Sequence, residues 1–231
     1  MIPFLAIAGT WAWNGSSVGR WYDSGSAWSA NMRARGFEHH HLLKGDGRPF
    51  VWTTDVNGQQ FWRRWFGKKP TTTDWQAAGH NLYAYCVPPI APEHQIQPCN
   101  LHIVTHSHGL QPVLFACADG LKVNTLVSVG SPVRSDMLEA ARRARRNIGF
   151  WWHFHSDGSD RWQWFGEVGD GSFGIVRQHP FADQNVGVPG VGHSNILNDT
   201  RLFHEVWGGP LDLIRSRHGR TDFTEADSRT A

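Results

Sequence analysis

Ser107 stands in a short polar break between two apolar stretches, where its hydroxyl is placed to act as a nucleophile. Residues 101–104 are mostly apolar and predict a short buried strand, and residues 111–118 predict a helix, with Pro112 tolerated in its first turn. A serine on a sharp strand-to-helix turn is a nucleophile elbow, which lifts the hydroxyl clear of its neighbours. The helix N-terminus behind it offers backbone N–H groups to a developing negative charge. This stretch therefore predicts covalent catalysis by Ser107.

The elements around Ser107 alternate between strand and helix. Residues 2–8 form a continuous apolar run, as expected of a strand covered on both faces. Further strands are expected over residues 37–43, 50–54, 123–129, 150–155 and 173–177, and helices over 26–35, 74–85, 136–147 and 196–206. The alternation predicts the α/β class, a mainly parallel central sheet flanked by helices on both faces. Residues 1–231 are expected to form one domain, with a polar, frayed tail from about residue 215.

Polar and glycine-containing loops follow several of the predicted strands. They comprise residues 9–11, 106–109, 130–132 and 157–160. In a parallel sheet the ligand binds outside the carboxyl ends of the strands, so these loops are expected to gather at one edge. That edge is the predicted site.

These features together resemble a small α/β-hydrolase, similar to compact bacterial and bacteriophage esterases and lipases. The resemblance covers residues 2–206 by element order. Its motifs are THSHG around Ser107, the strand followed by Gly9-Thr10, SDGSDRWQ over residues 156–163 and GVGHSNIL over residues 190–197. The chain departs from the family's G-x-S-x-G pentapeptide at Thr105, which stands at the first glycine. The tight turn crowds that position, so a threonine there requires repacking.

The resemblance implies a catalytic triad in the chain order serine, acid, histidine. The serine needs a neighbouring base at neutral pH, and a carboxylate holds that base in the correct tautomer. Ser107, Asp160 and His193 follow this order, each in a predicted loop. Asp160 is favoured because residues 160–163 resemble the stretch that carries the family's acid. Asp157 is the alternative acid, and either aspartate could instead be a turn residue bonded to its own backbone.

The base is assigned to His193 because it lies just before the last predicted helix, where the family places it. Its rivals are His179, which precedes a proline in a loop, and His204, which lies within that helix. His106 and His108 flank the nucleophile, but adjacent side chains on a sharp turn point away from it. They are expected to line the pocket or to pack beneath it.

The oxyanion hole is expected to consist of two backbone N–H groups. One belongs to His108, the residue after the nucleophile. The resemblance assigns the other to Thr10, which follows Gly9 as an oxyanion residue follows the family's His-Gly, with Trp11 as the alternative. The candidates for lining the substrate pocket are Trp11, His106 and Trp162.

Composition narrows the function classes further. A net charge of +2 over 231 residues gives no reason to expect nucleic acid or an acidic membrane as a partner. No run approaches the ~18 apolar residues of a transmembrane helix, and no basic residues precede the first apolar run. We therefore expect no transmembrane segment and no signal peptide, and a protein that stays in the cytoplasm or is released on lysis.

The three cysteines, Cys86, Cys99 and Cys117, are too few and too widely spaced for a disulfide framework or a zinc site. Free thiols are expected, although a Cys86–Cys99 bridge remains an alternative. No metal ion and no organic cofactor is expected to take part in the reaction.

The sequence thus predicts a serine esterase or lipase that acts on a small-molecule or lipid-like carboxylic ester through an acyl-enzyme. Two alternatives stay open. One is an acyltransferase, in which an alcohol replaces water as the acceptor, and the other is an inactive binding module of the same fold. The acyl chain length, the alcohol portion, the presence of a lid and the oligomeric state also stay open.

Overall fold

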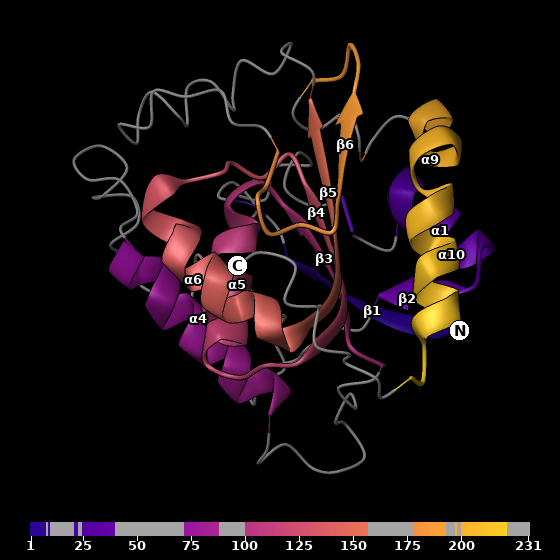
Figure 1. Ribbon diagram of the computed structural model, residues 1–231. Coiled ribbons are helices and arrows are strands. Elements are labelled where there is room, and N and C mark those ends of the chain that lie inside the picture. The colour runs from indigo at the N-terminus through magenta and orange to yellow at the C-terminus, as the bar shows by residue number, and fades with distance from the viewer. Residues whose placement is uncertain are drawn as a thin grey trace.

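The computed structural model describes residues 1–7, 9, 21–22, 25–39, 72–87, 100–156, 178–192, 197 and 200–220. The strands predicted over residues 50–54 and 173–177 lie outside these ranges. Within them, the described elements form one layered α/β arrangement around a central sheet (Figure 1).

The sheet contains six described strands, and every neighbouring pair is parallel. In spatial order they are β2 (Phe37–His39), β1 (Ile2–Ile7), β3 (His102–His106), β4 (Val123–Val129), β5 (Ile148–Ser156) and β6 (Gln184–Val188). This confirms the α/β class and the parallel sheet. The chain runs outward from β1 to β2, returns across β1 to β3, and then continues outward to β6. In open parallel sheets, ligands bind at such a reversal, outside the carboxyl ends of the two strands between which it occurs, here β1 and β3.

Helices α4 (Thr72–Cys86), α5 (Leu110–Ala118) and α6 (Leu138–Ala144) lie to one side of the sheet (Figure 1). Leu5 and Ile7 of β1 share a buried cluster with their apolar residues. Helix α5 is buried from residue 110 to residue 117, as its nearly continuous apolar sequence requires. Helices α4 and α5 approach so closely that a Cβ on Gly79 would lie 2.4 Å from the Cβ of Phe115.

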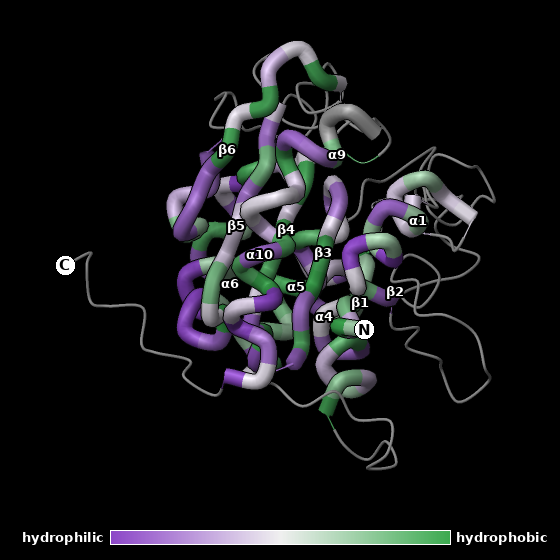
Figure 2. The backbone as a smooth tube through the Cα atoms, turned by 90° about the vertical axis from the view of Figure 1, so that its right-hand side faces the viewer, coloured by the Kyte–Doolittle hydropathy of each residue, from purple (hydrophilic) through white to green (hydrophobic). Residues whose placement is uncertain are grey.

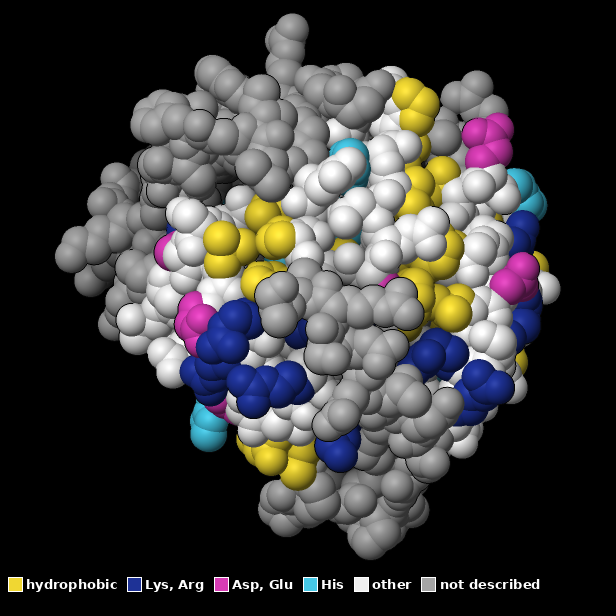
Figure 3. All heavy atoms as spheres, viewed as in Figure 1, with side chains coloured by type: hydrophobic (Ala, Val, Ile, Leu, Met, Phe, Trp, Pro, Cys, Tyr) yellow, Lys and Arg dark blue, Asp and Glu magenta, His cyan; other side chains and the backbone are white. Residues whose placement is uncertain are grey.

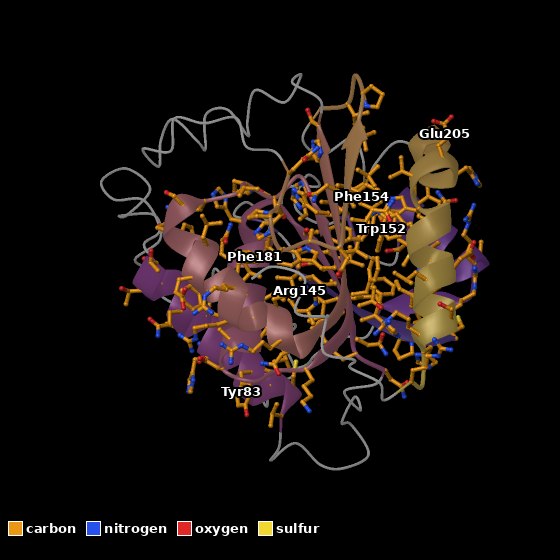
Figure 4. All side chains as sticks on the ribbon, in the orientation of Figure 1. Tyr83, Arg145, Trp152, Phe154, Phe181 and Glu205 are labelled. Carbon is orange, nitrogen blue, oxygen red and sulfur yellow. The ribbon has the colours of Figure 1, made fainter. Side chains whose placement is uncertain are left out.

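Helices α1 (Ala27–Ala34), α9 (Thr200–Val206) and α10 (Gly208–Arg217) lie to the other side (Figure 1). Along β1, Phe4 and Ala6 alternate with Leu5 and Ile7 and belong to a second buried cluster on this side of the sheet. Successive side chains of a strand point to opposite faces of the sheet, so both faces of β1 are covered. In Figure 4, Trp152 and Phe154 of β5 lie on the side of α9 and α10, whereas Phe181 lies on the side of α6.

Hydropathy follows the same layering. Figure 2 shows hydrophobic residues running through the central strands β3 and β4, and all residues of both strands are buried. Continuous apolar strands are stable only when both faces are covered, so the runs over residues 101–104 and 123–129 were readable from the sequence. The helices expected over residues 26–35, 74–85 and 136–147 are also present. They correspond to α1, to α4, and to α6 with its flanking 3₁₀ turns η5 (Ser135–Met137) and η6 (Arg145–Asn147).

No strand is expected from the sequence over residues 184–188, so the edge strand β6 is a difference. Its sequence, QNVGV, has no continuous apolar run, and only Val188 is buried, since an edge strand is covered on fewer sides than a central one. Helix α10 (Gly208–Arg217) was not predicted either. Residues 215–217, which were expected in the polar tail, belong to this helix. Helix α10 continues to Arg217, and the Asn124 side-chain amide donates to the Arg217 carbonyl at 2.9 Å.

None of the described helices is long and apolar enough to span a membrane. Figure 3 shows Lys and Arg side chains gathered low on one face, away from the upper ends of β5 and β6. On α6, Arg142 pairs with Glu139 at 2.7 Å, and Arg143 lies 3.9 Å from Asp119. Cys86 and Cys117 are free thiols, and Cys99 lies outside the described residues.

Two buried histidines, His102 and His179, have pKa values below the usual value for histidine. His102 of β3 is fully buried, and its Nε2 lies 3.1 Å from Nδ1 of His218. Burial, followed by the electrostatic influence of His218 and Arg217, lowers the pKa of His102 to about 3. His179 is 3 % exposed, and burial together with the nearby His153 holds its pKa well below the usual value.

Lowering the pH from about 7.5 to about 4.5 is expected to reduce the free energy of unfolding. The pKa of His102 is lower in the folded protein, so the unfolded chain binds the proton first as the pH falls. The contribution of His102 to the free energy of unfolding is complete above about pH 6.5, the usual pKa of histidine in an unfolded chain. It is lost as the pH falls toward the pKa of His102 in the folded protein. The slope is about 1.4 kcal/mol per pH unit for each such histidine. Urea unfolding followed by tryptophan fluorescence at several pH values measures it.

The matched variants for this measurement are His102→Phe and His80→Gln. His102→Phe removes the titrating group and is expected to flatten the slope. His80 is exposed on α4, so His80→Gln is expected to retain the wild-type slope. A wild-type slope in His102→Phe would show that this buried imidazole does not control acid stability.

Candidate functional site

Ser107 lies where β3 turns into a helix. Strand β3 ends at His106, the 3₁₀ turn η4 (Ser107–Gly109) follows, and α5 begins at Leu110. The φ angle of Ser107 is +54°, and no other non-glycine residue in the described ranges has a positive φ. This left-handed conformation costs about 1–3 kcal/mol in a residue with a side chain and tends to occur at functional sites. The predicted elbow geometry of Ser107 is therefore present.

The end of β1 lies directly against Ser107. A Cβ built on Gly9 would lie 2.7 Å from the Cβ of Ser107, 3.3 Å from its Oγ and 3.1 Å from the carbonyl oxygen of His106. A real Cβ atom does not fit at the shortest of these distances. Position 9 thus accommodates only glycine without movement, and Gly9 lies beside the hydroxyl of Ser107.

The residues before Ser107 alternate between the two faces of the sheet. Thr105 is fully buried, pairs with Ile7 and Ser128 across the sheet, and makes no hydrogen bond through its Oγ1 to the described residues. The fold accommodates this threonine at the first position of the pentapeptide. His106 is 7 % exposed and pairs with Val129, whose side chain belongs to the cluster beneath α9 and α10. His106 therefore packs within the protein beneath the turn.

His108 points toward α4. Its imidazole is stacked on the indole of Trp75, with ring centroids 5.8 Å apart and planes 10° apart. The guanidinium carbon of Arg134 lies 4.6 Å from the centroid of the same indole. Trp75 is 1 % exposed, so its ring is enclosed by these contacts and by the core.

Arg134 is held in turn by a carboxylate. Its Nε and Nη2 donate to the two oxygens of Asp136 at 2.9 and 2.8 Å, and the Thr72 hydroxyl donates to Asp136 at 3.1 Å. Burial alone would raise the pKa of Asp136, but its hydrogen bond to Arg134 and the Arg134 charge outweigh burial and lower it. Asp136 therefore remains a carboxylate and a firm partner for the guanidinium.

The loop after β4 lies over the first turn of α5. Gly130 has a φ of +59°, and its N–H donates to the carbonyl of Phe154 at 2.9 Å. The side-chain amide of Gln111 donates to the carbonyl of Pro132 at 3.3 Å. These bonds hold the loop that follows β4 against β5 and against the first turn of α5.

A buried polar network lies behind this edge. The Trp151 indole donates to the Ser128 hydroxyl at 2.8 Å, and Ser128 Oγ lies 2.8 Å from Nδ1 of His153. The rings of His155 and His179 lie 6.0 and 5.8 Å from that of His153. Within the described part of the chain, no three His, Cys, Asp or Glu side chains are arranged to hold a metal ion.

The rival bases are engaged elsewhere. His179 is buried against Trp151, with ring centroids 4.1 Å apart, and its Nδ1 accepts the backbone N–H of Phe181 at 3.4 Å. His204 is exposed on α9, where its Nδ1 lies 2.8 Å from a guanidinium nitrogen of Arg35. Each of these histidines therefore has its own packing or hydrogen-bonding partner in the structure.

Several predicted site residues lie outside the described residues, namely Asp157, Asp160, His193, Thr10, Trp11 and Trp162. Their flanking elements are described. Strand β5 ends at Ser156, the residue before Asp157. Strand β6 ends at Val188, and the described range continues to residue 192, just before His193. The structure therefore brings together Ser107, His108 and Gly9, and it shows which strand ends precede the predicted acid and base.

Sequence reasoning missed Trp75, Arg134 and Asp136. The sequence predicts only that Trp75 lies on the helix over residues 74–85, and it gives no role to Arg134 or Asp136. No local signal identifies them, because their contact with His108 joins α4, η4 and the loop before η5. Compared with known proteins, the chain matches no family model and no curated protein.

Proposed function

We propose that this protein is a serine-dependent hydrolase of carboxylic esters, built on the α/β-hydrolase fold. The observation that carries the proposal is the φ of +54° at Ser107, at the carboxyl end of β3 and beside Gly9. The reversal of strand order between β1 and β3 makes this the place where a parallel sheet binds ligands. A serine with left-handed backbone at that place is the arrangement of a nucleophile elbow, which supports the proposal.

In the proposed reaction, Ser107 Oγ bonds to the ester carbonyl carbon while His193 takes the hydroxyl proton. The carbonyl electron pair moves to the oxygen, which accepts hydrogen bonds from the backbone N–H groups of His108 and Thr10. The tetrahedral intermediate then expels the alcohol, which takes the proton from His193 and leaves an acyl-serine. Water, deprotonated by the same histidine, then attacks the acyl carbon. The bond to Ser107 Oγ breaks, the carboxylic acid leaves, and Oγ takes the proton back from His193. Asp160, or alternatively Asp157, orients the histidine.

The dimensions of the sheet are compatible with this triad. Neighbouring strands are about 4.8 Å apart, so the ends of β3 and β6 are about 14 Å apart across the sheet. Beyond β6, residues 189 and 190 form a turn in which Gly190 has a φ of +68°. Val191 belongs to the same buried cluster as Val129 and Phe154, which indicates that the chain turns back toward the middle strands. Asp157 is the first residue beyond β5, two strands from Ser107.

A fluorophosphonate probe tests the proposal, because it phosphonylates only a serine activated by a neighbouring base. Folded protein is expected to gain one adduct, which peptide mass spectrometry places on Ser107. Ser107→Ala is expected to remain unlabelled. Ser216→Ala removes an exposed hydroxyl that donates a hydrogen bond to the Leu213 carbonyl, and this variant is expected to be labelled like wild type. Absence of any adduct on the folded protein, while a control esterase reacts under the same conditions, would contradict the proposal.

A further inference from the structure

The stack of His108 on Trp75 belongs to a series of side-chain contacts that begins and ends on α4. Trp75 stacks on His108, Arg134 lies over Trp75, Asp136 binds Arg134 through two hydrogen bonds, and Thr72 donates to Asp136. Thr72 and Trp75 are one helical turn apart in α4, so the set begins and ends on the same helix. We call Thr72, Trp75, Arg134 and Asp136 the Trp75 brace.

The Trp75 brace acts on the residue next to the nucleophile. His108 shares a peptide group with Ser107, whose left-handed backbone persists only where the surroundings determine it. Gly9 packs closely against Ser107 on one side, since a Cβ at position 9 would lie 2.7 Å from the Cβ of Ser107. The ring stack on Trp75 restrains the His108 side chain, and through it the direction in which that residue leaves the turn.

We propose that Trp75 is a positioning residue that sets the direction of the His108 backbone N–H toward the oxyanion, and that Arg134 and Asp136 hold the indole in place. This inference rests on the proposed function, since the N–H of His108 matters only if an oxyanion forms at Ser107. A donor of this kind acts on the transition state and not on the bound ester. Disturbing the brace should therefore change kcat and leave KM almost unchanged.

The first test compares Trp75→Leu with Trp75→Phe. Trp75→Leu removes the ring, and kcat on a p-nitrophenyl ester is expected to fall about tenfold, with KM within about twofold of wild type. The rate of inactivation by the fluorophosphonate probe is expected to fall by a similar factor, because its phosphoryl oxygen occupies the oxyanion position. Trp75→Phe keeps a ring for stacking and is expected to recover most of the lost activity.

A second pair of variants guards against loss of folding in Trp75→Leu. The Asp136 side chain is 42 % exposed, so Asp136→Asn releases Arg134 without leaving a core cavity. It is expected to lower kcat in the same direction by a smaller factor. Glu139→Gln breaks the nearby ion pair with Arg142 and is expected to behave as wild type, because the Glu139 side chain is 65 % exposed and its ion pair joins two residues outside the Trp75 brace.

The outcomes separate this inference from the proposed function. A wild-type kcat and inactivation rate in folded Trp75→Leu or in Asp136→Asn overturn the positioning role, even though the wild-type protein is still labelled at Ser107. A rise in KM at constant kcat overturns it as well, since that result indicates ground-state binding. Equal losses in Trp75→Leu and Trp75→Phe show that ring stacking is not the cause. Failure of the wild-type protein to react at Ser107 is a different result, which removes the proposed function itself.

Discussion

Ester turnover is expected to fall by about 10⁴- to 10⁶-fold when Ser107 is replaced by alanine, because the acyl-enzyme can no longer form. The hydroxyl is the only group lost, and Ser107 is partly exposed at the edge of the sheet, so the fold is expected to persist. The measurement is kcat/KM on p-nitrophenyl esters of graded acyl length, together with circular dichroism. The same panel shows which acyl chains the wild-type protein accepts.

Ser107→Gly provides a second measurement at the same position. It is expected to be as inactive as Ser107→Ala but more stable than it by about 1 kcal/mol, because glycine adopts a φ of +54° without strain. Thermal unfolding of the two variants measures this difference. Turnover retained in both variants would mean that another residue is the nucleophile. Equal stability of the two would mean that the turn is not strained.

Gly9→Ala is expected to reduce turnover by about 10²- to 10³-fold even though residue 9 contributes no side chain to the reaction. The added methyl group would lie 2.7 Å from the Cβ of Ser107, so either the serine or the loop after β1 must move. In the proposed reaction that loop supplies the second oxyanion donor. A loss of about 1–3 kcal/mol in the free energy of unfolding is also expected from the overpacking.

Gly25→Ala is the matched control for Gly9→Ala. A Cβ at position 25 meets nothing within 4 Å, so activity and stability are expected to equal those of wild type. Full activity in Gly9→Ala, with the stability loss present, would show that the loop after β1 can move without disturbing the nucleophile. That result would remove the loop from the oxyanion site.

The local part of the candidate site was predictable because it lies within one short stretch of chain. The apolar residues before Ser107 require a buried strand, the apolar residues after it require a buried helix, and the polar residues between them mark the turn. The structure has this strand, turn and helix, and Ser107 lies in the turn with a φ of +54°. The triad partners His193 and Asp160 remain predictions, because they lie outside the described residues.

The sequence by itself determined the α/β class, the central strands and the position of the elbow, because continuous apolar runs are stable only where both faces of a strand are covered. The tertiary structure decided the rest. Strand β6 lies at the edge of the sheet, is only partly buried and has no continuous apolar run. Helix α10 is held partly by a hydrogen bond from Asn124, which lies on β4 far away in the sequence. The order of strands, the contact of Gly9 with Ser107 and the stack of Trp75 on His108 all depend on elements meeting in space. Such contacts follow from the packing of whole elements, which no local spacing of residues records.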